Sequence, residues 1–158
     1  MTAAVEYLSN KATEAEIADH LSRCDADFVP PLSSRVEIND YAQKITSKAT
    51  RFEAWSGGML VGLVANYCND QKSRIAYITS VSVLREWMCK GIAANLIKQC
   101  IKHAEMSGMR QISLEVASDN APAIKLYEKI GFVVCKVKAP FASMSLYLKS
   151  GEEHEQQA

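Results

Sequence analysis

The sequence predicts a mixed α/β fold, with a mostly antiparallel sheet of six to seven strands and about four helices on its two faces. The length of 158 residues suits one domain. Apolar residues make up 48% of the chain and charged residues 23%, enough for one hydrophobic core. The spacing of apolar residues also changes repeatedly between the period of a helix and the apolar–polar alternation of a strand. We expect one domain over residues 1–150 and a polar, disordered tail over residues 151–158.

The first third of the chain predicts one short strand and two helices. Residues 4–8 have the composition of a strand. Thr13 and Glu16 form a capping-box pattern, followed by apolar residues at helical spacing. A pair of prolines then indicates a loop. Ser34 and Glu37 predict a second capping box, with another apolar stripe after it.

The middle of the chain predicts three strands in a meander and then a helix. The strands cover residues 51–55, 59–67 and 75–83, and Gly57–Gly58 forms the first turn between them. Residues 91–107 place apolar side chains on one helical face and polar ones on the other. A glycine directly after this segment indicates the end of the helix.

The last third predicts a strand, a helix and two closing strands. Residues 111–116 alternate between apolar and polar, as half-buried strands do. Asn120 is a good N-cap for the next helix, and Gly131 ends it. Residues 132–137 and 143–148 form the closing strands. The crossover from the meander to the first of these strands is a β-α-β unit, so those two strands should be parallel.

Charge and cysteine content exclude several classes of protein. Eighteen basic and eighteen acidic residues cancel, so the sequence carries no electrostatic footprint for nucleic acid or an anionic membrane. The five cysteines have no C-x-x-C spacing. We expect reduced thiols and neither a disulfide framework nor a metal site. The sequence shows no signal peptide and no apolar run long enough to span a bilayer, which predicts a cytoplasmic protein.

A glycine lies where the third meander strand gives way to the long helix. Gly91 would let a ligand phosphate approach the backbone, because it has no Cβ. The first helical turn offers N–H groups without internal partners, and the helix dipole favours an anion there. Lys90 would add one positive charge. On its own, this glycine is equally consistent with a plain turn.

Two sequence blocks resemble the GCN5-related N-acetyltransferase superfamily. Val81-Ser82-Val83 followed by Met88-x-x-Gly91-x-Ala93 is similar to its motif A, although the family has Gln or Arg where this chain has Met88. The second block comprises Leu114-Glu115-Val116, Asn120 and the run from Leu126 to Phe132. Together they cover about residues 75–133. The resemblance implies the acyl-CoA N-acyltransferase fold and acetyl-CoA as co-substrate, with no metal.

The resemblance also implies which residues hold coenzyme A. Backbone amides of the turn would bind its pyrophosphate, and a strand splayed by a β-bulge would pair with its pantetheine arm. The implied contacts are Val81, Val83, Met88, Cys89, Lys90, Gly91, Ile92, Ala93, Asn120, Ala123 and Tyr127.

Transfer of an acyl group from a thioester to an amine needs a base for the ammonium and a proton donor for the leaving thiolate. The resemblance makes Tyr127 the candidate acid, although the apolar helix stripe also permits a core tyrosine. Glu115 is the candidate base, on the strand face opposite Ile112 and Leu114. Cys89 is a poor candidate nucleophile, since no histidine is near it in sequence. Direct transfer in a ternary complex is therefore expected.

The acceptor is expected to meet the first two helices and their connecting loop, residues 25–41, and the loop before the last strand, about residues 138–143. Phe28, Arg35 and Tyr41 are candidate contacts in the first of these regions. Each is also consistent with packing or solvation. We expect a small-molecule amine as acceptor and a monomer or homodimer. Two alternatives stay open: a protein N-terminal acetyltransferase of the ribosomal-protein type, which the pairing of Glu115 with Tyr127 favours, and a non-catalytic acyl-CoA-binding sensor.

Overall fold

The computed structural model describes residues 4–148, so the predicted tail lies outside the described residues. Within them the chain forms seven strands, four α-helices and three short 3-10 helices. In chain order these are β1 (Glu6–Ser9), α1 (Glu14–Cys24), η1 (Asp25–Asp27), η2 (Leu32–Ser34), α2 (Ile38–Lys48), β2 (Thr50–Ser56), β3 (Met59–Tyr67), β4 (Ile75–Val83), η3 (Arg85–Trp87), α3 (Ile92–Met106), β5 (Gln111–Ala117), α4 (Ala121–Ile130), β6 (Val133–Lys138) and β7 (Phe141–Tyr147).

The strands form one sheet in the order β1-β2-β3-β4-β5-β7-β6. The pairs β1–β2, β5–β7 and β6–β7 are antiparallel. The pair β4–β5 is parallel, in register from Ile75 opposite Gln111 to Ile78 opposite Leu114. The mixed fold and the predicted parallel crossover are therefore confirmed. Both strands continue past the paired residues, β4 to Val83 and β5 to Ala117.

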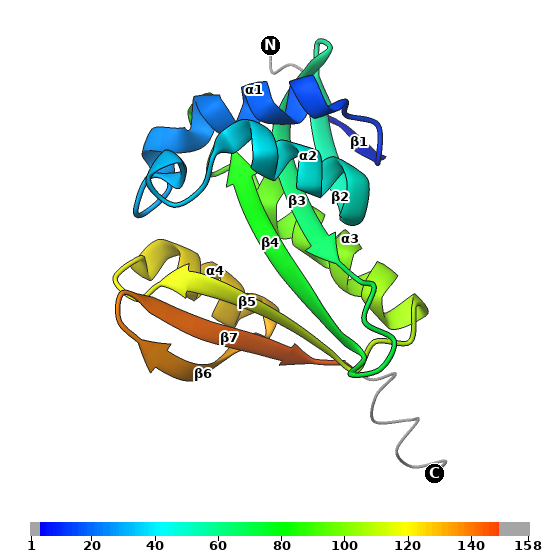
Figure 1. Ribbon diagram of the computed structural model, residues 1–158, viewed down its shortest axis with the longest axis vertical. Coiled ribbons are helices and arrows are strands. Elements are labelled where there is room, and N and C mark those ends of the chain that lie inside the picture. The colour runs from blue at the N-terminus through cyan, green and yellow to red at the C-terminus, as the bar shows by residue number, and fades with distance from the viewer. Residues whose placement is uncertain (1–3, 149–158) are drawn as a thin grey trace. The chain divides into compact units, whose positions relative to one another are not determined.

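The contacts cluster into two compact units, and the first comprises residues 4–65 and 80–97. In this unit α1 and α2 lie side by side over β2 and β3 (Figure 1). The first turns of α3 pack on the other face of β3, where Gly62 leaves room for them. A Cβ built on Gly62 would lie only 2.8 Å from Cγ2 of Ile92. Helices therefore cover both faces, as predicted.

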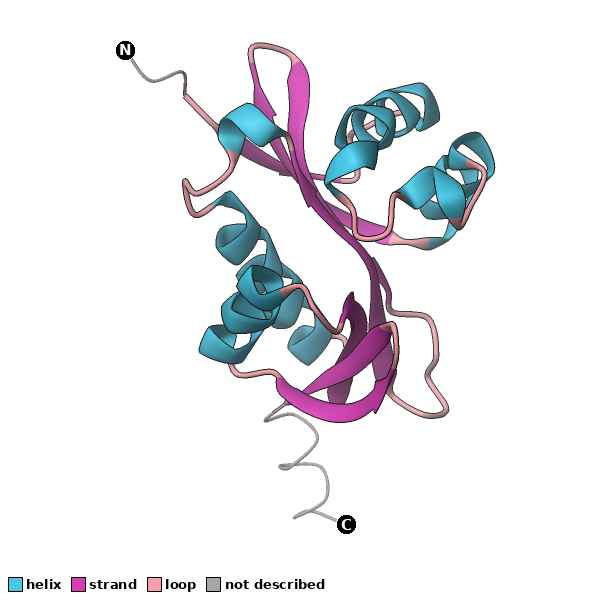
Figure 2. Cartoon of the chain, turned by 90° about the vertical axis from the view of Figure 1, so that its left-hand side faces the viewer, coloured by secondary structure: helices cyan, strands magenta, loops and turns pink. Residues whose placement is uncertain are grey.

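The second unit comprises residues 66–79 and the chain from residue 98 onward. Strands β5, β7 and β6 lie next to one another (Figure 1), and α4 and the rest of α3 lie on one side of them (Figure 2). The inward side chains are fully or almost fully buried; they include Ile112, Leu114, Met144 and Phe132. Among the described residues of this unit, no helix covers the opposite strand face.

The predicted capping boxes have different outcomes. At α1 the box is confirmed: Thr13 Oγ1 accepts the Glu16 amide at 3.1 Å, and Glu16 accepts the Thr13 amide at 2.9 Å. At α2 the prediction is wrong, because Glu37 is itself the N-cap. Its carboxylate accepts the amides of Asn39 and Asp40, while the Ser34 hydroxyl donates to a proline carbonyl. A glutamate is long enough to fold back on the helix start, which makes the serine unnecessary.

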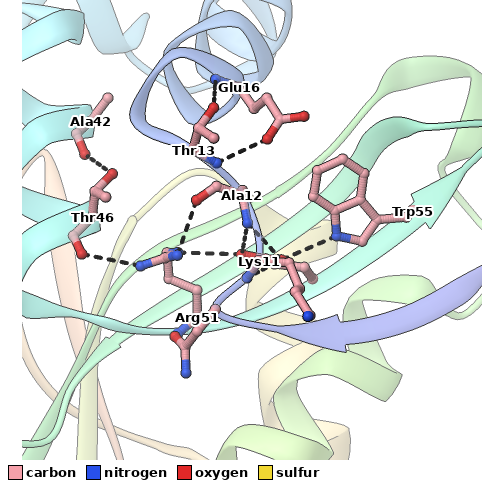
Figure 3. A network of polar contacts seen from close by, with 10 residues as sticks. Lys11, Ala12, Thr13, Glu16, Ala42, Thr46, Arg51 and Trp55 are labelled. Carbon is pink, nitrogen blue, oxygen red and sulfur yellow. Dashed lines mark hydrogen bonds and ion pairs between the residues drawn. The ribbon is translucent and has the colours of Figure 1, made fainter.

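A buried carboxylate fixes the entry into α1. Glu53, fully buried on β2, accepts both the Lys11 and the Ala12 amides, at 3.0 to 3.2 Å (Figure 3). It also accepts the Trp55 indole N–H and pairs with Arg51 at 3.3 Å. Arg51 in turn donates to backbone carbonyls of α2 and of the segment before α1. Each charge therefore has several partners, as buried ions require.

Two segments differ from the sequence prediction in detail. The proline-containing loop after α1 is not irregular throughout, because it contains η1 and η2. Strand β7 begins at Phe141 rather than at residue 143, because it pairs with β6 as far as Lys138, next to the turn. Within residues 4–148, no helix combines the length and the apolar content needed to cross a membrane.

Candidate active site

The turn before α3 has the backbone geometry expected of an anion seat. Met88 is extended, and Cys89 and Gly91 have positive φ angles of 61° and 81°. The helix starts directly afterwards at Ile92. The amides of the first helical turn have no partner within the helix, so they remain available to an anion. Residues 88 to 91 are all exposed, which leaves the backbone accessible.

Gly91 is not explained by crowding within the protein. A Cβ at this position would meet no protein atom within 4 Å. Its positive φ favours glycine, and the space beside it is open. Both features agree with the predicted role of a close approach by a ligand.

Two buried side chains pack the start of α3 against β3. Ile92 is 3% exposed and Leu96 is fully buried. Both side chains lie against Gly62 of β3, at 2.8 and 3.3 Å from a Cβ built there. Ala93, by contrast, is half-buried. The inward residues therefore hold the first turn in place.

A buried histidine bonds to the strand that leads into this turn. His20 of α1 is 1% exposed. Its Nδ1 lies 3.0 Å from the carbonyl of Leu60, which can only accept, so Nδ1 carries the proton. Nε2 then accepts from the hydroxyl of Ser82, at 2.9 Å. Ser82 lies between Val81, half-buried, and Val83, buried, the two predicted pantetheine contacts. Burial lowers the pKa of His20, which favours the neutral ring.

The same segment is tied to the loop after α1. Arg85 of η3 forms an ion pair with Asp27 of η1. The amide of Leu84, just before, donates to the Val61 carbonyl of β3 at 2.9 Å. The sequence pattern gave no signal for either contact, because both join residues far apart in the chain.

Tyr127 lies in the second unit, on α4. It is 8% exposed, and its ring meets that of Phe132 edge-on at 6.0 Å. Burial raises the pKa of Tyr127 to about 12, so the hydroxyl stays protonated at neutral pH. The structure therefore shows a tyrosine packed in the core, as the apolar helix stripe permitted, and its role as an acid stays a prediction.

Glu115 is exposed on β5, on the face without helices. The hydroxyl of Tyr77 donates to its Oε1 at 3.2 Å. Tyr77 is opposite Ser113 in the β4–β5 pairing, so it lies on the same sheet face as Glu115. Tyr77 was not among the residues predicted from the sequence, although its position in an alternating strand could have placed it on this face.

Glu115 and Tyr127 approach β5 from opposite sides. Ile112 and Leu114 are buried and Glu115 is exposed, so Glu115 projects from the opposite face of β5. Helix α4 lies on one side of this strand (Figure 2). Asn120, which lies between Glu115 and Tyr127 in the sequence, caps α4 by accepting the Ala123 amide at 3.4 Å, as predicted. The second unit therefore contains both candidate proton-transfer groups, whereas the turn residues belong to the first unit.

The candidate acceptor contacts all lie in the first unit. Phe28 and Tyr41 are half-buried and Arg35 is exposed. Within residues 4–148, no group of three or more histidine, cysteine or acidic side chains is arranged to hold a metal ion.

The chain belongs to the acetyltransferase (GNAT) family, whose model matches residues 14–132. It is 35% identical over 95 residues to the uncharacterized N-acetyltransferase YsnE of Bacillus subtilis, covering 59% of this chain and 60% of that one. It is 30% identical over 86 residues to the N-alpha-acetyltransferase MAK3 of Arabidopsis thaliana, covering 54% and 45%. The matches thus span about half the length of these relatives.

Solved structures share the fold. The PaiA N-acetyltransferase of Thermoplasma acidophilum, crystallised in complex with coenzyme A, superimposes with a TM-score of 0.69 at 15% identity. The superposition covers 91% of this chain and 99% of that one. This likeness, and the family match, confirm the acyl-CoA N-acyltransferase fold that the two sequence blocks implied.

Proposed function

We propose that the chain is an acetyl-CoA-dependent N-acetyltransferase that acts on the primary amine of a small molecule by direct transfer in a ternary complex. The main support is the turn at residues 88–91, with two positive φ angles directly before α3, in a chain that belongs to this family. The coenzyme A bound to the Thermoplasma acidophilum protein of the same fold agrees with this donor.

The donor would bind by its pyrophosphate at the turn. The unpaired amides at the start of α3 supply hydrogen bonds, and the helix dipole supplies part of the positive charge. Exposed Lys90 adds a further charge. Met88 in place of the family's Gln or Arg removes one polar side chain, so the proposal relies on backbone donors there.

Proton transfers then divide between two side chains. Glu115 takes a proton from the ammonium, directly or through a water, and the free amine attacks the thioester carbonyl. As the N–C bond forms and the C–S bond breaks, Tyr127 donates its proton to the leaving thiolate. The new amide nitrogen gives up its second proton, directly or through water, to the Tyr127 phenolate, and the proton held by Glu115 passes to solvent. The raised pKa of Tyr127 keeps that proton available, although a pKa of about 12 makes it a weak acid. A covalent acyl-enzyme is unnecessary, since Cys89 has no base assigned to it.

Replacing Tyr127 with Phe tests this assignment. Among the described residues no hydrogen bond is formed by its hydroxyl, so the variant should fold normally. We expect kcat to fall by roughly 10²- to 10⁴-fold, the range of general acid catalysis. The Kd for acetyl-CoA should stay unchanged. Unchanged turnover would exclude Tyr127 from the chemistry.

A protein N-terminal amine is the second candidate acceptor. It is favoured by the similarity to a relative named as an N-alpha-acetyltransferase. A parallel assay with small amines and with short peptides having free N-termini separates the two. Tight acetyl-CoA binding without transfer to any amine would instead support an acyl-CoA sensor.

A further inference from the structure

The helix-free face of the second unit carries a row of charged and polar residues across three strands. Glu115 on β5 is directly opposite Ser143 on β7. The register of β6 shifts between Val134 and Lys136, and this shift brings Lys136 opposite Ser143. Residues directly opposite one another project from the same face of a sheet. The candidate base and Lys136 therefore share one face, separated by a small hydroxyl side chain.

A second lysine lies on the same face in the neighbouring row. Lys138 is directly opposite Phe141, which is directly opposite Ala117. Both lysines are exposed. Within residues 4–148 neither forms an ion pair, so both ammonium groups are available to a ligand.

The row has a defined length. Adjacent strands are about 4.8 Å apart, so the backbones of Glu115 and Lys136 are roughly 10 Å apart. The flexible stem of lysine shortens the gap between the two charged groups. A carboxylate at one end and an ammonium at the other match a molecule of opposite polarity: an amine beside Glu115 and an anionic group beside the lysines.

We propose that the acceptor is a small amino-carboxylic acid, whose carboxylate is bound by Lys136 and Lys138 while its amine faces Glu115. This inference rests on the proposed function, since it extends the site at which Glu115 acts as base. The Ser143 hydroxyl, half-buried between the charges, is available to a polar chain. A purely cationic polyamine would place a positive charge next to both lysines, so this face disfavours it.

The two lysines have a competing structural explanation. Strand β6 is the edge of the sheet, and edge strands often carry lysines that prevent pairing with another chain. In that case reversing the charges would change self-association and leave acceptor kinetics unaltered.

The test compares matched acceptors in the full chain. Each ω-amino acid with two to six carbons is paired with the alkylamine of equal length, and transfer is followed by free thiol release. We expect the wild type to prefer the amino acid at one or more lengths by roughly three- to tenfold in kcat/KM, since each exposed ion pair contributes little. The double variant K136E/K138E should lose this preference, through a higher KM for the amino acid, and keep its KM for acetyl-CoA.

Lys102→Glu is the control, because Lys102 is exposed on α3, a helix outside this strand face. It should retain the preference. Equal use of both acceptor classes by the wild type, or a preference that survives in K136E/K138E, would overturn the carboxylate site and leave the proposed function standing. Absence of transfer to every amine would overturn both. Size-exclusion chromatography of the double variant detects an edge-protecting role: a new oligomer with unchanged KM values would also overturn the proposal.

Discussion

Tyr77 and Glu115 are joined by a hydrogen bond of 3.2 Å across the parallel pair β4–β5. The bond spans 38 residues of sequence and lies on the face of β5 opposite the buried side chains of Ile112 and Leu114. It restrains the carboxylate that we propose as base, because a donor on a paired strand fixes one of its two oxygens. Tyr77 is therefore a positioning residue in the proposed reaction.

Tyr77→Phe should lower kcat/KM for the acceptor by roughly 2- to 10-fold, the value of one hydrogen bond of about 0.5–1.5 kcal/mol. The KM for acetyl-CoA should not change. Steady-state kinetics with both substrates measures the two values. Tyr147→Phe is the matched control, since Tyr147 is opposite Gln111 on the same face and is 60% exposed. Equal effects of the two substitutions would contradict the role of Tyr77.

Gly91→Ala should raise the Kd for acetyl-CoA about tenfold or more, because the added methyl group enters the space assigned to the phosphate. Gly108 offers a matched control, with a φ of 80° against 81° and likewise no atom near its Cβ. Each substitution should cost about 1–2 kcal/mol of stability through left-handed backbone strain. Calorimetric titration and thermal unfolding measure the two effects, and weakened binding in both variants would contradict the anion seat.

Acid should destabilise the protein through His20. Burial lowers its folded pKa below the ordinary 6.5, although nearby Asp19 opposes the shift. Below pH 6.5 the unfolded chain therefore binds a proton that the folded chain resists, and stability falls as pH decreases toward the folded pKa. We expect the Tm to decline from pH 7 to pH 5, and the His20→Gln variant to decline less. An equal slope in that variant would show that other groups dominate.

Alkali should destabilise the protein through Cys100. This thiol is fully buried, and burial raises its pKa from 9.0 to about 12. Between these pH values the unfolded chain loses a proton that the folded chain retains, so stability falls by up to about 1.4 kcal/mol per pH unit. Chemical unfolding between pH 8 and 10.5 should reveal the slope, reduced in Cys100→Ala. Cys89→Ser, at an exposed thiol, should keep it.

Local pattern predicted most of the architecture. Alternation placed β5 and the orientation of Glu115, and glycines marked the ends of α3 and α4, because these features depend on residues close in sequence. The prediction that Tyr127 acts as an acid came only from the family resemblance, because its apolar surroundings alone indicated a core tyrosine.

The periodicity of the sequence did not predict contacts between residues that are far apart in the chain. The bond from His20 to Ser82 spans 62 residues, and that from Tyr77 to Glu115 spans 38. Each depends on strand register and helix placement, which periodicity does not fix. The wrong capping box at α2 has a different cause: Ser34 and Glu37 fit the motif, yet the carboxylate reaches the helix amides without help.

Gly62 makes the turn at residues 88–91 dependent on β3. Since a methyl group of Ile92 lies where a side chain at position 62 would be, even alanine there would require Ile92 to shift or the first turn of α3 to move. A lineage that loses this glycine is therefore expected to change the packing at Ile92 as well. Directed evolution of donor preference should accordingly yield paired changes at positions 62 and 92, and single substitutions at 62 should be eliminated early.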